Sequence, residues 1–326
     1  MHVMIIGAAG MIGRKLAARL AKSAAIGSST VDQMTLVDVI PSPAPSAEFG
    51  ADIRVADLSM PGEAERLIAS RPDTIFHLAA IVSGEAEADF EKGYRVNLDG
   101  TRLLFEAIRK IGRGQAYRPR VVFSSSIAAF GGSFPDEIED DFITTPATSY
   151  GTQKVIGELL LADYSRRNLL DGIGIRLPTI CIRPGKPNKA ASSFFSGILR
   201  EPLIGEEAVL PVSEELRHWF ASPRAAIAFL EHAATIDLSA LGVRRSLTMP
   251  GLSVSVGEQI EALRQFAGDK AVRLIRREPD EAIARIVAGW PSKFNARRAE
   301  DLGFRADASF ADIVRAHIED ELGGRV

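Results

Sequence analysis

Residues 1–13 read MHVMIIGAAGMIG, an apolar run that leads into three glycines, Gly7, Gly10 and Gly13. A glycine-rich turn between a strand and a helix lets backbone N–H groups and the helix N-terminus approach a pyrophosphate, and the last glycine allows the helix to pack closely on the strand. The run has no basic leader and continues into an amphipathic pattern, so we expect a strand instead of a signal peptide. This segment predicts the first strand and first helix of a dinucleotide-binding fold.

The second predicted strand ends in an acidic residue, a position at which dinucleotide-binding folds bind a ribose. Asp38 ends the second β-branched run, from which an acidic residue reaches the ribose 2′-hydroxyl of a dinucleotide. Val39 and Ile40 follow instead of a basic residue, so a 2′-phosphate would meet negative charge with no arginine beside it. We predict NAD over NADP as the cofactor. The alternative is that the glycines only turn a tight loop and Asp38 caps a helix.

Beyond this segment, the first half of the chain alternates short β-branched runs with longer helical patterns. The runs cover residues 3–6, 35–38, 53–55, 74–77 and 121–124, and the helical patterns cover residues 12–22, 62–69, 96–111 and 155–164. This alternation is typical of a parallel sheet with helices on both faces. We therefore predict an α/β fold with a doubly wound parallel sheet of the Rossmann type.

The organisation changes after this half. The run GIRLPTICI at residues 174–182 contains Pro178, which should end or bend the strand, and the turn formers PGKPNK follow at 184–189. We predict an NAD-binding Rossmann domain over residues 1–183. Residues 184–326 are predicted to form mostly a smaller, mainly helical substrate cap, with some segments returning to the first domain. There, Ser255 and Glu258 have capping-box spacing at the start of a predicted helix.

Composition excludes several classes of protein. The 326 residues are 46% hydrophobic and 25% charged with a formal net charge of -3, so we expect a globular chain and no nucleic-acid partner. The longest run without a charged residue, 121–135, holds several serines and glycines, so we expect no membrane segment. The single cysteine, Cys181, cannot form an internal disulfide, which favours a cytoplasmic location. No spacing of His, Cys or Asp predicts a metal site.

Tyr150 and Lys154 place a phenol and an ammonium one helical turn apart on the same face of a predicted helix. A free tyrosine titrates near pH ~10, and a neighbouring ammonium together with an oxidised nicotinamide would favour the phenolate, so Tyr150 is a candidate base. The triplet Ser124, Ser125 and Ser126 ends a strand at the carboxyl edge of the sheet, where a hydroxyl can hold a substrate oxygen. Alternatively, the pair is an exposed helix pair and the triplet is a polar turn.

Further motifs accompany these residues in chain order. They are Asp57-Leu58, HLAA at residues 77–80, NLDGT at 97–101 and RPG at 183–185. Together with the glycine turn, Asp38, the serine triplet and Tyr150-xxx-Lys154, they resemble the extended short-chain dehydrogenase/reductase family. The resemblance implies an NAD-dependent enzyme in which Ser126 is the catalytic serine, Tyr150 the base and Lys154 a ligand of the ribose hydroxyls.

The resemblance also implies a cofactor site. Asp57 and Leu58 would flank the adenine, residues 78–80 would line the cleft, and Asn97 would support the site from a helix. The full cofactor-binding set is Gly7, Gly10, Met11, Ile12, Gly13, Asp38, Asp57, Leu58, Leu78, Ala79, Ala80, Asn97, Ser124, Tyr150, Lys154 and Pro178. One departure is visible: Phe130-Gly131 stands where many sugar-nucleotide epimerases and dehydratases of the family carry Tyr-Gly, which removes a hydroxyl from the pocket wall.

Three longer segments narrow the expected substrate. HLAAIVSGEAEADFEKGYRVNLDGT, RLPTICIRPGKPNKAASSFFSGI and LRHWFASPRAA are similar to the D-erythronate dehydrogenase branch of the family, which oxidises the C2 hydroxyl of a four-carbon sugar acid with NAD. The substrate carboxylate then needs a cation, for which Arg183 and Arg217 are the candidates. Alternatively, Arg183 fastens a loop and Arg217 pairs with Glu214 or Glu215 at the surface.

The remaining substrate-binding candidates supply hydroxyl and amide groups. They are Ser83, Ser126, Thr179, Asn188 and Ser192. Ser83 could instead only shape a loop and Ser192 only cap a helix. Trp219 could form part of the pocket wall, but we expect Trp219 and His77 to be packed in the core.

Two rival functions stay open at this point. One is a nucleotide-sugar epimerase or dehydratase that keeps NAD tightly bound, and the other is a non-catalytic NAD-binding redox sensor, against which the intact Ser126, Tyr150 and Lys154 argue. The helical patterns at 96–111 and 155–164 carry more apolar residues than one sheet face needs. Since these helices pair in dimers of the family, we expect a homodimer, although core burial explains the same stripe.

Overall fold

The computed structural model describes residues 1–185 and 192–325, and the chain divides into two compact units. Unit 1 comprises Met1–Ala129, Thr148–Arg176 and Ile227–Leu247, and unit 2 comprises Phe130–Ala147, Leu177–Ala226 and Thr248–Val326. Each unit therefore combines segments that are distant in the sequence. The assignment of residues 184–326 to a substrate cap stays a prediction.

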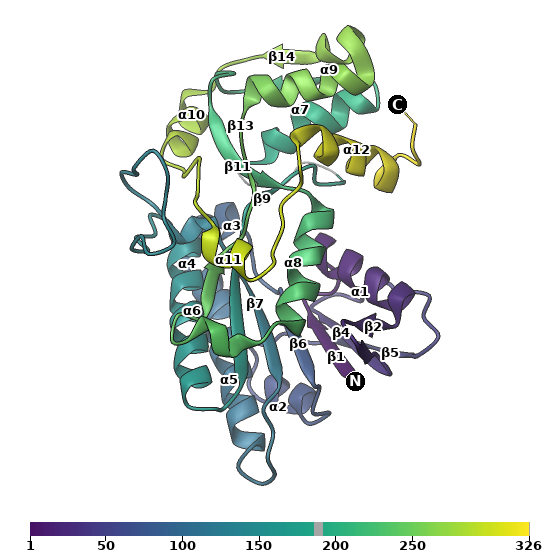
Figure 1. Ribbon diagram of the computed structural model, residues 1–326, viewed down its shortest axis with the longest axis vertical. Helices are drawn as coiled ribbons and strands as arrows, with labels where there is room; N and C mark the ends of the chain where they lie inside the picture. The colour runs from purple at the N-terminus through teal and green to yellow at the C-terminus, as the bar shows by residue number, and fades with distance from the viewer. Residues whose placement is uncertain (186–191, 326) are drawn as a thin grey trace. The chain divides into compact units, whose positions relative to one another are not determined.

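A seven-stranded sheet is the centre of unit 1, with the strand order β12-β8-β7-β6-β1-β4-β5 (Figure 1). Its strands are β1 (His2–Ile6), β4 (Gln33–Asp38), β5 (Gly50–Val55), β6 (Thr74–His77), β7 (Arg120–Ser126), β8 (Asp171–Leu177) and β12 (Ser246–Thr248). Strand β1 pairs in parallel with β4 on one side and with β6 on the other, and β4 with β5 and β6 with β7 are also parallel. The predicted doubly wound Rossmann sheet is confirmed.

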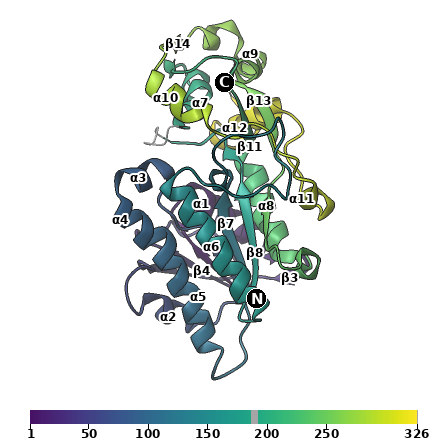
Figure 2. The same cartoon turned by 90° about the vertical axis from the view of Figure 1, so that its left-hand side faces the viewer.

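Helices cover this sheet on both faces. The helices of unit 1 are α1 (Met11–Ser23), α2 (Glu63–Ile68), α3 (Ser83–Ala88), α4 (Phe90–Gly93), α5 (Gly100–Ile111) and α6 (Ser149–Arg166), with the 3-10 turns η2 (Ile127–Ala129) and η3 (Leu238–Leu241) and the short hairpin β2 (Ala25–Ile26) and β3 (Ser29–Thr30). Figures 1 and 2 both show α5 and α6 side by side against the sheet, while α1 lies on the other face. The central strand β1 is buried from residue 3 to residue 6, as expected for a parallel strand covered on both faces.

One predicted helix has a different start. The pattern over residues 96–111 forms α5 only from Gly100, and a π-helical turn, η1 (Tyr94–Asp99), precedes it. The side chain of Asn97 in this turn bonds to the backbone of Ile81, and the Thr101 hydroxyl donates to the Asn97 carbonyl over 2.7 Å. These side-chain bonds satisfy groups that a regular helix would pair differently, which accounts for the irregular turn.

Unit 2 combines helices with two small sheets. Its elements are β9 (Thr179–Ile180), α7 (Ser193–Leu203), β10 (Ala208–Leu210), β11 (Arg217–Ala221), β13 (Leu252–Ser255), α9 (Val256–Val272), β14 (Ile275–Arg277), α10 (Glu281–Ala288), α11 (Arg297–Asp301) and α12 (Phe310–Glu321); α8 (Pro223–Thr235) begins in unit 2 and ends in unit 1. The capping box is confirmed, because Ser255 Oγ accepts from Glu258 N and the Glu258 carboxylate accepts from Ser255 N. Strand β8 ends at Leu177, immediately before Pro178, as predicted.

Within residues 1–185 and 192–325, no helix has the length and apolar content that a membrane crossing requires.

Candidate active site

The register of the sheet brings three strand ends to one edge. Ile6 at the end of β1 lies opposite Val37 of β4 and His77 of β6. The backbone N–H groups of Gly7 and Ala8 both donate to the Val37 carbonyl, over 2.8 and 3.0 Å. The glycine turn after β1, the end of β4 and the loop after β6 therefore meet at the carboxyl edge of the sheet, where open α/β sheets bind their ligands.

The turn needs glycine at two positions. Gly7 has φ +94°, and a Cβ there would lie 2.6 Å from the backbone N of Ala79. A Cβ on Gly13 would lie 2.2 Å from the Gly7 carbonyl oxygen. The first glycine thus allows two loops to approach each other, and the last allows α1 to approach the turn.

Helix α1 presents its N-terminus to this edge. Its N-cap residue is Gly10, which makes no side-chain capping bond, and its first turn contains no acidic residue. The first backbone N–H groups of a helix have no partner within the helix and carry a partial positive charge. An uncapped start without a carboxylate suits the phosphate oxygens of a dinucleotide.

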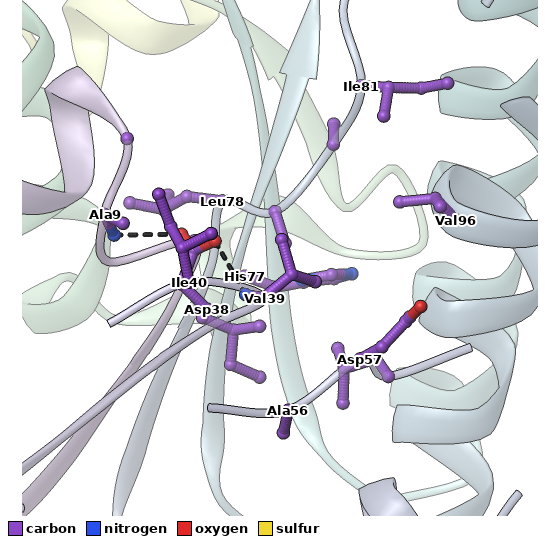
Figure 3. Close-up of a pocket in the computed structure, with 16 residues that line it drawn as sticks. Ala9, Asp38, Val39, Ile40, Ala56, Asp57, His77, Leu78, Ile81 and Val96 are labelled. Atoms are coloured by element: carbon purple, nitrogen blue, oxygen red, sulfur yellow. Dashed lines mark hydrogen bonds between the residues drawn. The ribbon is translucent and has the colours of Figure 1, made fainter. Parts of the chain in front are cut away.

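Asp38 is held in place at the end of β4. One carboxylate oxygen accepts from Ala9 N over 2.9 Å and the other from Val39 N over 2.7 Å (Figure 3). Beside it, the side chains of Val39 and Ile40 are 61% and 59% exposed. Exposed aliphatic side chains next to a fixed carboxylate form a surface for a flat apolar ring attached to a sugar with free hydroxyls.

A cavity of about 350 Å³ opens at this point in unit 1 (Figure 3). Half of the predicted cofactor set lines it, namely Gly7, Gly10, Asp38, Asp57, Leu58, Leu78, Ala79 and Ala80. The sequence reasoning missed Ile6, Ala9, Val39, Ile40, Ala56, His77, Ile81 and Val96, which line it as well. Each of them stands next to, or within two positions of, a predicted residue, so widening each motif would have found them. The other half, Met11, Ile12, Gly13, Asn97, Ser124, Tyr150, Lys154 and Pro178, lies outside this cavity.

Two side chains around the cavity are fixed by hydrogen bonds. Asp57 accepts from Ser59 N and Ser59 Oγ, over 2.9 and 2.6 Å. Buried Asn97 accepts from Ile81 N over 2.9 Å and donates to Gln153 of α6 over 2.8 Å. Asn97 therefore joins the cavity wall to the helix that carries Tyr150.

His77 is a core histidine, as predicted. It is buried, and its Nε2 lies 2.9 Å from Thr101 Oγ1. Burial lowers the pKa of His77 to about 3, with a smaller contribution from the charge of Lys154. The imidazole is therefore neutral at physiological pH.

Helix α6 carries the predicted tyrosine and lysine near its start. Thr148 caps the helix by accepting from Gly151 N over 3.0 Å, which sets Tyr150 in the first turn. The Lys154 ammonium lies 5.6 Å from the centre of the Tyr150 ring and donates to the Ser124 carbonyl over 2.8 Å. The structure thus brings Tyr150, Lys154 and the end of β7 together.

Lys154 is almost completely enclosed, with 2% of its surface exposed. Burial lowers the pKa of its ammonium to about 8, and the negative charge of Glu158 partly opposes that effect. An ammonium whose pKa is this close to neutrality is sensitive to small changes in its surroundings.

The serine triplet divides into two buried hydroxyls and one that is half-buried. Ser124 Oγ donates to the His77 carbonyl over 3.1 Å, and Ser125 Oγ donates to Glu158 over 2.5 Å. Ser126 Oγ accepts from Ala128 N over 3.1 Å. Ser126 is therefore the member of the triplet whose hydroxyl hydrogen is suited to a ligand oxygen.

The substrate candidates belong to both units of the chain. Ser83 is the first residue of α3 in unit 1. In unit 2, Ser192 is the N-cap residue of α7 but makes no side-chain capping bond, and Thr179 Oγ1 lies 2.7 Å from buried His218 Nε2. The backbone N of Arg183 donates to Ser196 Oγ, and Asn188 lies outside the described residues.

The alternative prediction for Arg217 is a surface ion pair, and the partner predicted for that pair is wrong. Arg217 forms an ion pair with Glu258 over 2.9 Å, not with Glu214 or Glu215. The reason is the antiparallel pairing of β11 with β13, which sets Arg217 opposite Ser255, at the start of the helix whose capping box contains Glu258. Buried Trp219 donates to the Met249 carbonyl over 3.2 Å, as expected for a packing residue.

The model of the NAD dependent epimerase/dehydratase family matches residues 3–233, which is more than half of the chain. The chain belongs to this family. Its cofactor is NAD, and with relatives that are named dehydrogenases it is an NAD-dependent oxidoreductase.

Three known proteins are particularly similar to the chain. The D-erythronate dehydrogenase of Cupriavidus necator is 46% identical over 326 residues, covering 98% of each chain. The D-erythronate dehydrogenase of Haemophilus influenzae is 44% identical over 319 residues, covering 98% of this chain and 99% of that one. The crystal structure of the nucleoside-diphosphate-sugar epimerase from Agrobacterium tumefaciens has a TM-score of 0.96 and 65% identity, covering 99% of this chain and 95% of that chain.

Proposed function

We propose that the chain oxidises the C2 hydroxyl of a short sugar acid, D-erythronate or a close analogue, to the 2-keto acid. The observation that carries the chemistry is the Lys154 ammonium, fixed on the Ser124 carbonyl beside the Tyr150 ring. The support for the substrate class comes from two relatives that match nearly the whole chain and are named D-erythronate dehydrogenases.

In the proposed reaction, the Tyr150 phenolate removes the proton of the C2 hydroxyl. The Lys154 ammonium stabilises the phenolate before that step, because an adjacent positive charge favours the ionised phenol. Ser126 donates a hydrogen bond to the reacting oxygen and so fixes its position. Bound NAD supplies the acceptor for the hydrogen and electron pair that leave C2.

The cofactor residues fit this assignment. The uncapped start of α1 suits the pyrophosphate, and the fixed carboxylate of Asp38 suits the hydroxyls of a ribose. Asp57 and Leu58 are proposed to lie against the adenine and Lys154 to bind the second ribose. With Val39 and Ile40 following Asp38, no cation stands next to that carboxylate in the chain to pair with a 2′-phosphate.

The substrate carboxylate is proposed to bind Arg183 or Arg217. Arg217 already pairs with Glu258, so binding through Arg217 has to compete with that ion pair. Hydroxyl and amide contacts are proposed for Ser83, Thr179, Asn188 and Ser192. The Thr179 hydroxyl is oriented by its contact with His218, whose pKa is lowered to about 3 by burial, so the imidazole is neutral.

A specific observation favours a second candidate function, a nucleotide-sugar epimerase. The solved structure that is 65% identical carries that name. Against it, Phe130 replaces the tyrosine found in many such enzymes, and its ring is buried against Phe294 and Phe142 at centroid distances of 5.4 and 6.2 Å. A phenyl group enclosed by two others supplies no hydroxyl to a sugar.

The two functions are separated by net cofactor turnover. Purified protein is mixed with NAD and a panel of four- to six-carbon sugar acids and UDP-sugars, and reduced cofactor is followed by absorbance. We expect net NADH formation with four-carbon acids and none with UDP-sugars. Copurifying NAD, conversion of a UDP-sugar without net reduction and no turnover of sugar acids would establish the epimerase instead.

The chain is further proposed to act as a homodimer through α5 and α6. Leu159 of α6 is 66% exposed and Phe90 of the neighbouring α4 is 60% exposed, so both apolar side chains are accessible to a second copy of the chain. Light scattering at low concentration should give twice the mass of the chain. A monomer would contradict the proposal, and Leu159→Glu should produce one if the face is the interface.

A further inference from the structure

A third charged side chain continues the face of α6 that carries Tyr150 and Lys154. Glu158 stands one helical turn after Lys154, and only 7% of its side chain is exposed. Its carboxylate accepts two hydrogen bonds from Arg176 of β8, Nε at 2.9 Å and Nη2 at 2.7 Å. The same carboxylate accepts from Ser125 Oγ of β7 over 2.5 Å. Glu158 therefore joins α6 to two strands of the sheet.

These contacts lie directly beside the proposed catalytic groups. Ser125 is bonded to Glu158, its neighbour Ser126 is the proposed oxygen-binding residue, and the carbonyl of Ser124 receives the Lys154 ammonium. The end of β7 is thus held on α6 at two consecutive residues, by a carboxylate at one and an ammonium at the next. A shift of Glu158 would move both Ser126 and Lys154.

The charges around Lys154 also depend on Glu158. The neighbours of the ammonium are the Ser124 carbonyl, the rings of Phe123 and Tyr150, and neutral His77. None of these carries a negative charge while Tyr150 is protonated. Arg176 of β8 adds a second positive charge, so Glu158 is the carboxylate that offsets both cations.

Several other carboxylates lie on elements packed against α6, and they bond to other groups: Glu85 of α3 pairs with Lys92, and Asp99 of η1 pairs with Arg102. Glu87 of α3 bonds to Ser149 N at the start of the helix, and Glu106 of α5 bonds to Tyr164 near its end. Glu87 thus bonds to the backbone just before Tyr150, and Glu106 bonds well beyond Lys154 along the helix. Glu158 is the carboxylate whose charge raises the pKa of Lys154.

We propose that Glu158 is a positioning residue that keeps Lys154 in its ammonium form and locks the end of β7, through Ser125, so that Ser126 faces the reacting oxygen. This inference rests on the proposed roles of Tyr150, Lys154 and Ser126. A purely structural ion pair between α6 and β8 predicts lost stability and nothing else. The proposed role predicts a changed titration of Lys154 in the folded protein.

The titration can be measured without any substrate. Protein labelled with ¹³C at the lysine ε-carbons is titrated by NMR, and the Lys154 signal is assigned by its absence in Lys154→Arg. Glu158→Gln keeps an oxygen for Ser125 but removes the charge, so the pKa of Lys154 should fall by about 1 unit or more from its wild-type value near 8. Glu158→Asp keeps the negative charge, so the pKa of Lys154 in this variant should stay close to its wild-type value.

A matched control removes a carboxylate from the same helix. Asp163→Asn breaks an exposed ion pair with Arg166 and should leave the Lys154 titration unchanged. If Glu158→Gln fails to fold because Arg176 is left unpaired, the double variant Glu158→Gln, Arg176→Met removes both buried charges. In this double variant, the pKa of Lys154 should still be lower than in the wild type.

Kinetics give the second test. With the substrate that wild-type protein turns over, the alkaline limb of the kcat profile should move to lower pH in Glu158→Gln by the same amount as the Lys154 titration, while the KM for NAD changes less than kcat. The inference is overturned if Lys154 has its wild-type pKa in both the single and the double variant. Absence of sugar-acid turnover in the wild type contradicts only the proposed function, because the NMR result stands without it.

Discussion

Removal of the Asp38 carboxylate should change which dinucleotide the protein prefers. In Asp38→Ala, the backbone N–H groups of Ala9 and Val39 lose the oxygens that they now contact at 2.9 and 2.7 Å, and a bound ribose loses its acceptor. A hydrogen bond to a charged group is worth about 1.5–3 kcal/mol, so NAD affinity should fall roughly 10- to 150-fold. The same change removes a negative charge that faces a 2′-phosphate, so NADP affinity should rise.

Isothermal titration calorimetry with NAD and NADP measures both effects in the absence of substrate. Asp52→Asn is the matched control, because Asp52 lies on the adjacent strand β5, pairs with Arg54 and does not line the cavity. This control should bind both cofactors like the wild type. Unchanged NAD affinity in Asp38→Ala, or NADP binding that becomes weaker still, would refute the assignment of Asp38 to the ribose.

Three further outcomes follow from the described residues. Gly7→Ala should lower the free energy of unfolding by more than about 2 kcal/mol, because its Cβ would lie 2.6 Å from Ala79 N, whereas Gly62→Ala, also at positive φ but with open space around it, should cost only about 1 kcal/mol; urea unfolding of both variants checks this. The unfolded chain takes up a proton at His77 below pH 6.5, whereas the folded chain does so only below about pH 3. As the pH is lowered between these values, His77 should therefore reduce the free energy of unfolding by about 1.4 kcal/mol per pH unit. His77→Gln should therefore reduce the acid sensitivity measured by urea unfolding from pH 6 to 4, and an unchanged slope would show that the imidazole is protonated in the folded state. Finally, activity should survive prolonged dialysis against a chelator; loss of rate that a divalent ion restores would mean that a metal takes part.

The order of elements in unit 1 could be predicted because its signals are local. The run before Gly7, the β-branched runs that end at Asp38 and His77, and the helix after Tyr150 each show their own period in the sequence. Parallel strands that are buried on both faces carry continuous apolar runs, so their ends also mark the binding edge. For this reason the sequence predicts Asp38 and the glycine turn at the edge of the sheet where the cavity lies.

Features that depend on long-range pairing could not be predicted. The π-helical turn before α5 arises from the bonds of Asn97 to Ile81 and Gln153, which are distant in the chain. The ion pair of Arg217 with Glu258 requires the pairing of β11 with β13. Neither contact leaves a trace in periodicity or composition.

Glu158 is an intermediate case. Its place one turn after Lys154 puts it on the same helical face, so a search at helical spacing would have selected it. Its partners, Ser125 and Arg176, come from two different strands, and only the sheet order brings them to one carboxylate. The sequence could therefore have indicated the residue, but not what it holds.

The Tyr150→Phe variant tests whether the Tyr150 hydroxyl carries the proton transfer. Proton transfer by a positioned side chain contributes about 10²- to 10⁴-fold, so kcat with the sugar acid should fall by at least about 100-fold while the Kd for NAD stays within about twofold of the wild type. Tyr117→Phe is the matched control, since it removes a phenolic hydroxyl that only donates to the Pro72 carbonyl, and it should keep its rate. A Tyr150→Phe protein that binds NAD normally and retains most of its kcat would contradict the account.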